Sequence, residues 1–191
     1  MTIAKGPRVF VSGTGARVAA SRVSREAVSA RRVRDVVLHT VKRAAPQVIG
    51  DVGVLLTDDA SIRRLNKRFR AVDTSTDVLA FPLTDGLAEG EPFGDVVISC
   101  QTALRQARSY GASLGDEISR LLIHGTLHLC GYDHHERKEA ARMFALTRRL
   151  LDDVGTVARG TSVSPPMSRR KSRRGEKRQR SASKDRTTPH A

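Results

Sequence analysis

One segment, from Asp116 to Cys130, constrains the fold of this chain more than any other. Its apolar residues are distributed around most of the circumference of a helix; they are Ile118, Leu121, Leu122, Leu127 and Leu129. A helix that is apolar on nearly all sides is buried in the middle of a domain. The sequence therefore predicts a central buried helix over 116–130, which ends at Gly131 because glycine readily adopts positive φ.

The flanking segments predict an α+β domain around this helix. Apolar periodicity and capping residues predict four more helices: 24–45 with Ser24 as N-cap, Asp58 or Asp59 to about Phe69, Ser99 to Gly111, and Glu136 to about Asp152. Alternating or β-branched runs predict strands at 51–57, 78–81 and 95–99, with 83–94 as a loop. We expect a mixed sheet of about four strands packed with about five helices.

Charge is distributed unevenly along the chain. Its net charge is +14, and the excess lies at the two ends. Residues 1–35 contain eight Lys or Arg and two acidic residues, and residues 165–191 contain ten Lys or Arg and two acidic residues. Residues 36–164 contain sixteen basic and sixteen acidic residues and are therefore neutral overall. The Ser-, Arg- and Lys-rich end is too polar to bury a core, so we expect one domain over 1–160 and a disordered tail over 161–191. This tail either aids solubility or tethers the protein to RNA or DNA by phosphate contacts.

The composition excludes several classes of protein. No run of 18 apolar residues spans a bilayer, and the N-terminal residues lack the continuous apolar region of a signal peptide. Cys100 and Cys130 are too few for a disulfide scaffold and fit a reducing compartment, so we expect a cytoplasmic protein. With no Trp and 4% aromatic residues, a stacking surface for single-stranded nucleic acid is not well supplied.

Histidines cluster at the end of the predicted central helix. His124 and His128 are four residues apart and therefore project from one face, and His134 follows the helix-ending Gly131 by three residues. The resulting H-x3-H-x5-H spacing predicts a metal site. Three imidazoles suit a single Zn²⁺ ion and leave the fourth tetrahedral position for water, which is typical of catalytic zinc.

The same spacing resembles the zinc-binding helix of the metzincin peptidases, in which a Glu follows the first His and acts as general base. Here that position is Gly125. Glycine inside a helix costs about 1 kcal/mol relative to alanine, so we expect backbone or substrate to come close at this point. Asp133 is the carboxylate nearest the motif, and we interpret it as an orienting partner of a ligand histidine. His135 is expected to be exposed or to support a ligand.

Arg70 ends the predicted helix that precedes strand 78–81. The residues alone leave two interpretations open: Arg70 is one of five surface cations between Arg63 and Arg70, or its guanidinium turns toward the metal. In the second case its planar fork matches a phosphate and can stabilise charge on phosphoryl oxygens. Thr76 and Asp77 are expected to cap or pin the following loop.

Three blocks of the chain resemble the bacterial YbeY family in their order and spacing: LNKRFRAVDTSTDVLAFP, FGDVVIS and HGTLHLCGYDH. The resemblance extends over about residues 8–154. It implies an α+β domain with one zinc ion held by His124, His128 and His134. It also implies a single-strand-specific, metal-dependent endoribonuclease that acts in 3′-end maturation of 16S rRNA and in ribosome quality control.

The same resemblance implies a functional role for Arg70, so that Arg70 and His124 are the expected catalytic residues. The chemistry that we expect is cleavage of a phosphodiester with zinc as Lewis acid and Arg70 holding the developing charge. The implied partners are single-stranded RNA, rRNA, and the small ribosomal subunit or its assembly factors, without DNA or membrane.

Two other functions stay open. One is a metal-dependent hydrolase of a peptide or small amide, against which the missing Glu at Gly125 argues. The other is a non-catalytic ribosome-assembly factor, in which zinc is structural and the basic ends bind rRNA. The open fourth coordination position of a three-histidine site argues against this second alternative.

Overall fold

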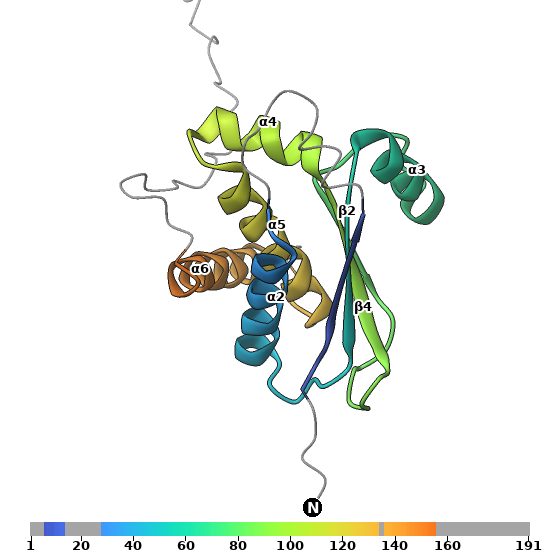
Figure 1. Cartoon of the computed structure of the whole chain (residues 1–191), viewed down its shortest axis with the longest axis vertical. Coiled ribbons are helices and arrows are strands. Elements are labelled where there is room, and N and C mark those ends of the chain that lie inside the picture. The colour runs from blue at the N-terminus through green and yellow to red at the C-terminus, as the bar shows by residue number, and fades with distance from the viewer. Residues whose placement is uncertain (1–5, 14–27, 134–135, 156–191) are drawn as a thin grey trace, which may run out of the picture.

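The chain folds around a four-stranded mixed sheet with helices on both of its faces (Figure 1). The computed structural model describes residues 6–13, 28–133 and 136–155. The strands, in their order across the sheet, are β1 (Val9–Gly13), β2 (Asp51–Thr57), β4 (Pro92–Ser99) and β3 (Val78–Pro82). β1, β2 and β4 run parallel, whereas β3 pairs antiparallel with β4 at the edge. The predicted mixed sheet is confirmed.

Five helices accompany these strands within the described residues. They are α2 (Ala30–Ala44), α3 (Asp59–Arg70), α4 (Cys100–Tyr110), α5 (Leu114–Leu129) and α6 (Arg137–Asp153). Helices α2, α4, α5 and α6 lie on one side of the sheet and α3 lies on the other (Figure 1). The predicted α+β class and the numbers of strands and helices are therefore confirmed.

Helix α5 occupies the centre of the larger layer. It contacts α2, α4 and α6 as well as strands β3 and β4. Most of its residues are buried, and its leucines and isoleucines join the valines of α2, β2 and β4 in one core. A second, smaller cluster of Ile62, Leu79 and Val97 lies between α3 and the opposite face of the sheet. The prediction of a central helix is confirmed, with a start two residues earlier than expected.

Two local predictions were wrong, and one strand was not predicted. The N-cap of α2 is Ser29, not Ser24, because the Ser29 side chain accepts a hydrogen bond from the Arg32 amide (3.2 Å). Strand β4 begins at Pro92, inside the predicted loop 83–94; proline is tolerated as the first residue of a strand because its missing N–H is not needed there. Strand β1 was not predicted; it pairs in parallel with β2, with Val9 opposite Val52.

Within the described residues, none of the helices combines the length and the apolar character needed to cross a membrane. The predicted domain boundary at residue 160 and the basic segment 161–191 lie outside the part of the chain that the structure describes.

Candidate active site

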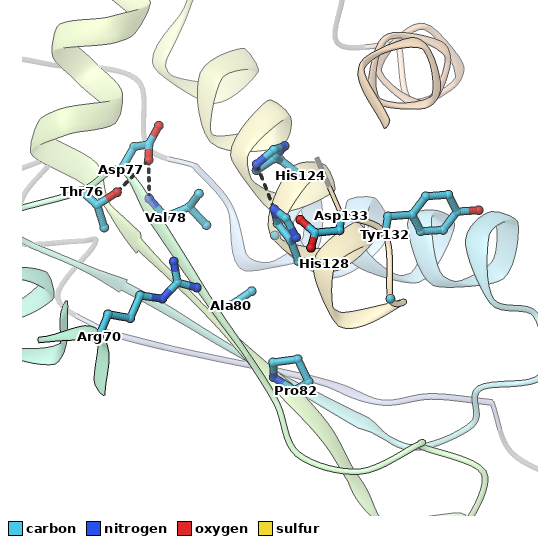
Figure 2. A pocket seen from close by; sticks show the side chains of 12 residues that line it. Arg70, Thr76, Asp77, Val78, Ala80, Pro82, His124, His128, Tyr132 and Asp133 are labelled. Atoms are coloured by element: carbon cyan, nitrogen blue, oxygen red, sulfur yellow. Dashed lines mark hydrogen bonds between the residues drawn. The ribbon is translucent and has the colours of Figure 1, made fainter. Parts of the chain in front are cut away.

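Two of the predicted metal ligands lie one helical turn apart near the end of α5. The helix is capped by Ser113, whose hydroxyl accepts a hydrogen bond from the Asp116 amide (3.1 Å), and burial of its apolar residues fixes its rotation against the sheet. As a result, His124 and His128 face the same direction, with 3.3 Å between their Nε2 atoms and nearly perpendicular rings. The Nε2 atoms of the two imidazoles thus lie side by side, next to one common position (Figure 2).

The separation of these nitrogens fits a shared metal ion. Two imidazole nitrogens at about 2.0–2.1 Å from a tetrahedral zinc ion are about 3.3–3.4 Å apart. The observed 3.3 Å between the Nε2 atoms of His124 and His128 matches that value. His134, the third predicted ligand, and His135 lie outside the described residues. Among the residues that are described, no group of three metal-ligating side chains is present.

The turn after α5 begins at Gly131 with positive φ, as predicted. Gly131 has φ of +83°, which reverses the chain, so that Tyr132 and Asp133 line the same cavity as the two histidines. Figure 2 shows Asp133 next to His128, and both residues line the same cavity. Burial raises the pKa of the neighbouring Cys130 thiol to about 12.

The histidines open onto a cavity of about 570 Å³ that also contains Arg70. Arg70 is the last residue of α3 and reaches this cavity from the side opposite α5, with Val78, Ala80 and Pro82 of β3 between them (Figure 2). The structure therefore places Arg70 at the cavity that the histidines line, and its role toward a metal or a phosphate stays a prediction. Arg70 is exposed, but it faces the histidine pair across one cavity.

The segment between α3 and β3 is held in place by its own polar contacts. The chain turns directly after Arg70 because Ala71 adopts the left-handed conformation with φ of 57°. The buried Asn66 amide then donates to the Thr74 carbonyl (2.9 Å), and Asp73 accepts hydrogen bonds from Arg63 (2.8 Å) and Lys67 (2.9 Å). Hydrogen bonds from Arg63 and then Lys67 lower the pKa of Asp73 to about 2.

Thr76 and Asp77 pin the start of β3, as the sequence predicts. One carboxylate oxygen of Asp77 accepts from the Val78 amide (2.8 Å) and from the Thr76 hydroxyl (3.2 Å), and the other accepts from Gln106 (3.0 Å). Both residues line the cavity. Their contacts join the edge strand to α4 and fix the cavity wall that faces His124.

Sequence reasoning did not find an ion pair that precedes the histidines on α5. Glu117 is 3% exposed and accepts a hydrogen bond from Arg120, with 2.5 Å between Oε1 and Nη2. The spacing of an acid three residues before an arginine was the available signal, but this pattern is common on exposed helices. Glu117 is buried because neighbouring helices and strands pack around α5, which the local spacing does not show.

Gly125 allows α5 to approach the sheet closely. A Cβ atom at this position would lie 2.8 Å from Cγ1 of Val96 and 3.1 Å from Cγ2 of Val78. A close approach is present at Gly125, but it is made by side chains of β4 and β3 and not by the backbone or substrate that the sequence led us to expect. A glutamate like that of the metzincin peptidases has no room at this position.

Comparison with known proteins supports the resemblance on which these predictions rest. A family model described as Endoribonuclease YbeY matches residues 19–155. Proteins named Endoribonuclease YbeY from Myxococcus xanthus and Gloeobacter violaceus are 46% and 47% identical over 64% and 58% of this chain. The relative of that name from Heliobacterium modesticaldum is 41% identical over 55% of this chain.

The match covers these relatives unequally: 42% of the Myxococcus protein, 60% of the Gloeobacter protein and 70% of the Heliobacterium protein. The solution structure of TM1509 from Thermotoga maritima is also similar, with a TM-score of 0.51 and 27% identity over 78% of this chain and 88% of that chain. Since the family model spans most of the sequence and the relatives agree with it, this chain belongs to the YbeY family.

Proposed function

We propose that this protein is a zinc-dependent endoribonuclease that cleaves single-stranded RNA. The observation that carries the proposal is that the paired Nε2 atoms of His124 and His128 and the guanidinium of Arg70 line one cavity. Imidazoles that converge on one point suit a metal ion, and a guanidinium opposite them suits a phosphate. The name shared by the relatives, Endoribonuclease YbeY, agrees with this chemistry.

His124, His128 and, beyond the described residues, His134 would hold the zinc ion, which when bound supplies Lewis acidity toward a phosphoryl oxygen. The residues of the chain contribute binding and orientation. Arg70 donates two parallel hydrogen bonds to the phosphate and stabilises the charge that grows on its oxygens during cleavage. Asp77 keeps the start of β3 in place, so that the distance across the cavity stays fixed.

We further propose that the biological substrate is rRNA, with action in late 3′-end maturation of 16S rRNA and in ribosome quality control, in the cytoplasm. The excess positive charge of 1–35 and 165–191 supports binding near the small ribosomal subunit, because clustered cations bind phosphates irrespective of sequence. The middle of the chain is neutral overall, which supports separate roles for its parts: cleavage depends on a few site residues, and attachment to rRNA depends on the basic ends.

Cleavage of defined RNAs by metal-free and zinc-loaded protein tests the proposal. We expect the zinc-loaded protein to cut a single-stranded RNA internally, to leave the same sequence intact as a duplex, and to lose activity with a chelator. Casein, tested in parallel, should remain intact. Equal cleavage by metal-free protein would contradict the role of zinc. RNA binding without cleavage, together with an effect on subunit assembly, would favour a non-catalytic assembly factor.

A further inference from the structure

A second cavity, of about 670 Å³, lies on the face of the sheet that carries α3. Ala80 and Pro82 of the edge strand β3 line both this cavity and the one that contains the histidines. The two cavities therefore meet along β3. A chain molecule bound at Arg70 can continue over this strand into the second cavity.

The second cavity gathers aromatic side chains from distant parts of the sequence. Three of the five phenylalanines line it: Phe10 from β1, Phe69 from α3 and Phe81 from β3. Phe10 and Phe69 are 55% and 56% exposed, and the rings of Phe69 and Phe81 meet edge to face with centroids 5.1 Å apart. We name this surface the phenylalanine groove. Although the aromatic content of the chain is low, the fold concentrates it at this groove.

Two arginines lie against rings of the phenylalanine groove. The guanidinium carbon of Arg8 lies 5.5 Å from the ring centre of Phe10, and that of Arg68 lies 5.2 Å from the ring centre of Phe69. Arg8 also donates two hydrogen bonds to Asp51 (2.9 and 2.6 Å), so Arg68 is the better placed of the two to meet a phosphate. Arg70, the next residue after Phe69, lines the cavity of the histidines. Aromatic rings that accept bases, beside cations that accept phosphates, are the combination that binds single-stranded nucleic acid.

The groove also holds an acceptor for a base. Asp95 is exposed on β4 and lines the cavity together with the rings. A carboxylate can accept a hydrogen bond from a base N–H, such as the amino group of cytosine or the N3–H of uracil, and it repels a phosphate. The arrangement thus suits a base inside the groove and the sugar-phosphate chain along its rim.

We propose that the phenylalanine groove binds a nucleobase of single-stranded RNA whose backbone crosses β3 to the phosphate position at Arg70. This inference rests on the proposed function, because it assigns a base position to the same substrate. Phe69 and Arg70 are consecutive residues, so a base on the first and a phosphate on the second belong to one short stretch of nucleotides. A duplex keeps its bases paired and cannot fill the groove, which accounts for selectivity toward single strands.

Single-tryptophan variants test the contact directly, because the chain has no tryptophan. Phe69→Trp places an indole in the groove, and Phe144→Trp places one on α6, where Phe144 is similarly exposed (54%) but does not line the groove. With chelator present to prevent cleavage, a single-stranded oligouridylate should quench the fluorescence of the Phe69→Trp protein strongly. It should leave that of Phe144→Trp nearly unchanged, and a duplex of the same length should quench neither.

Affinity measurements with the full chain provide the second test. Phe69→Ala should weaken binding of the oligouridylate roughly five- to 150-fold, the range found when one stacking side chain is removed. Phe69→Trp should retain the affinity, and Phe144→Ala should match the unaltered protein. The measurements belong at a salt concentration high enough to suppress the phosphate contacts of the basic ends. An oligonucleotide without bases should bind the unaltered protein and Phe69→Ala equally.

Three results would overturn the inference. The first is an affinity of Phe69→Ala for the oligouridylate equal to that of the unaltered protein, and the second is a loss of affinity in Phe144→Ala as large as that in Phe69→Ala. The third is a change from dimer to monomer in Phe69→Ala without loss of RNA binding, because the groove would then be a contact between two copies of the chain. Cleavage by zinc-loaded protein, measured in parallel, separates this inference from the proposed function. If the RNA is cleaved but does not quench the fluorescence of Phe69→Trp, the groove is not a base-binding site and the proposed function stands. If the RNA quenches this fluorescence but is not cleaved, the groove binds RNA and the proposed nuclease activity is wrong.

Discussion

The Nε2 atoms of His124 and His128 lie 3.3 Å apart on consecutive turns of α5. Because α5 is held on several sides by α2, α4, α6 and the sheet, this spacing is a property of the buried helix. A ligand pair that is fixed before the metal arrives loses little conformational freedom when it binds. We therefore expect the pair to dominate the affinity for zinc.

Replacement of either histidine by alanine should remove zinc from the purified protein. His124→Ala and His128→Ala each leave one imidazole of the pair, whereas His39→Ala is a control on α2, where His39 contacts Asp153 (3.4 Å). Elemental analysis of untagged protein should find stoichiometric zinc in the unaltered chain and in His39→Ala only. Circular dichroism should show the same helix content in all variants. Retention of zinc in both site variants would contradict the assignment.

Replacement of Arg70 should reduce cleavage while leaving the metal bound. Removal of one preorganised donor to a developing oxyanion costs about 10²- to 10³-fold in rate, and we expect a loss of this size for Arg70→Ala. Arg70→Lys should recover only part of it, because an ammonium lacks the bidentate fork. Arg64→Ala is the matched control, since Arg64 lies on the same helix and contacts Ser61 (2.9 Å). An equal loss in Arg64→Ala would show that general positive charge matters more than position.

Gly125→Ala should destabilise the domain although it replaces glycine inside a helix. The added Cβ would meet Val96 at 2.8 Å and Val78 at 3.1 Å, both within the packed core. Overpacking costs about 1–3 kcal/mol, and the better helix propensity of alanine returns about 1 kcal/mol. The net loss in the free energy of unfolding, measured with urea, should thus be about 0–2 kcal/mol.

Gly115 on the same helix provides the control for this substitution. A Cβ there would lie 2.8 Å from Nη1 of Arg32, the end of a flexible side chain that can move away. Gly115→Ala should therefore be neutral or stabilise the fold by up to about 1 kcal/mol. If both variants gained stability, the close approach of Gly125 to the sheet would be wrong.

The elements with strong local signals were predictable from the sequence. β2 has the predicted bounds 51–57 because its apolar residues alternate, and α4 begins after Ser99 and ends before Gly111 because both caps are local. β1 was missed because an edge strand of five residues with mixed polarity is defined by its pairing with β2. Register across a parallel sheet is not encoded within five residues.

The candidate site was predictable only in part for the same reason. The spacing of His124 and His128 on one helix fixes their proximity, whereas Arg70 lines their cavity only because the tertiary fold places the end of α3 there. The phenylalanine groove was beyond sequence reasoning, because Phe10 and Phe81 are brought together only by the strand order β1-β2-β4-β3. Composition predicted a poor stacking surface, since it contains no information about where the rings gather.

Deletion of residues 165–191 should weaken RNA binding without affecting zinc. This segment contains ten Lys or Arg and two acidic residues, and each phosphate contact to single-stranded RNA contributes about 0.7 to the slope of log affinity against log salt. The truncated protein should show a smaller slope and an unchanged zinc content. Loss of zinc on truncation would show that the ends and the site are not independent.

Asp73 should make the loop before β3 sensitive to acid. Hydrogen bonds from Arg63 and Lys67 lower its pKa from 3.8 to about 2 in the folded protein. A carboxylate with a lowered pKa stabilises the fold above its unfolded pKa, and this contribution disappears as the pH falls through its folded value. The stability difference between the unaltered protein and Asp73→Asn should therefore be complete at neutral pH, shrink below a pH of about 4, and vanish below about 2.

Urea unfolding at a series of pH values measures this difference. The effect at neutral pH should be small because Asp73 is exposed to solvent and water screens its ion pairs. Asp35→Asn is the control, because Asp35 also faces an arginine on a helix surface but makes a weaker contact. Its carboxylate oxygen lies 3.7 Å from Nε of Arg31, whereas the oxygens of Asp73 lie 2.8 Å from Arg63 and 2.9 Å from Lys67. Asp35→Asn should change the unfolding midpoint less than Asp73→Asn at neutral pH. A difference between the unaltered protein and Asp73→Asn that persists below a pH of about 2 would mean that asparagine acts on packing and not through the lost charge.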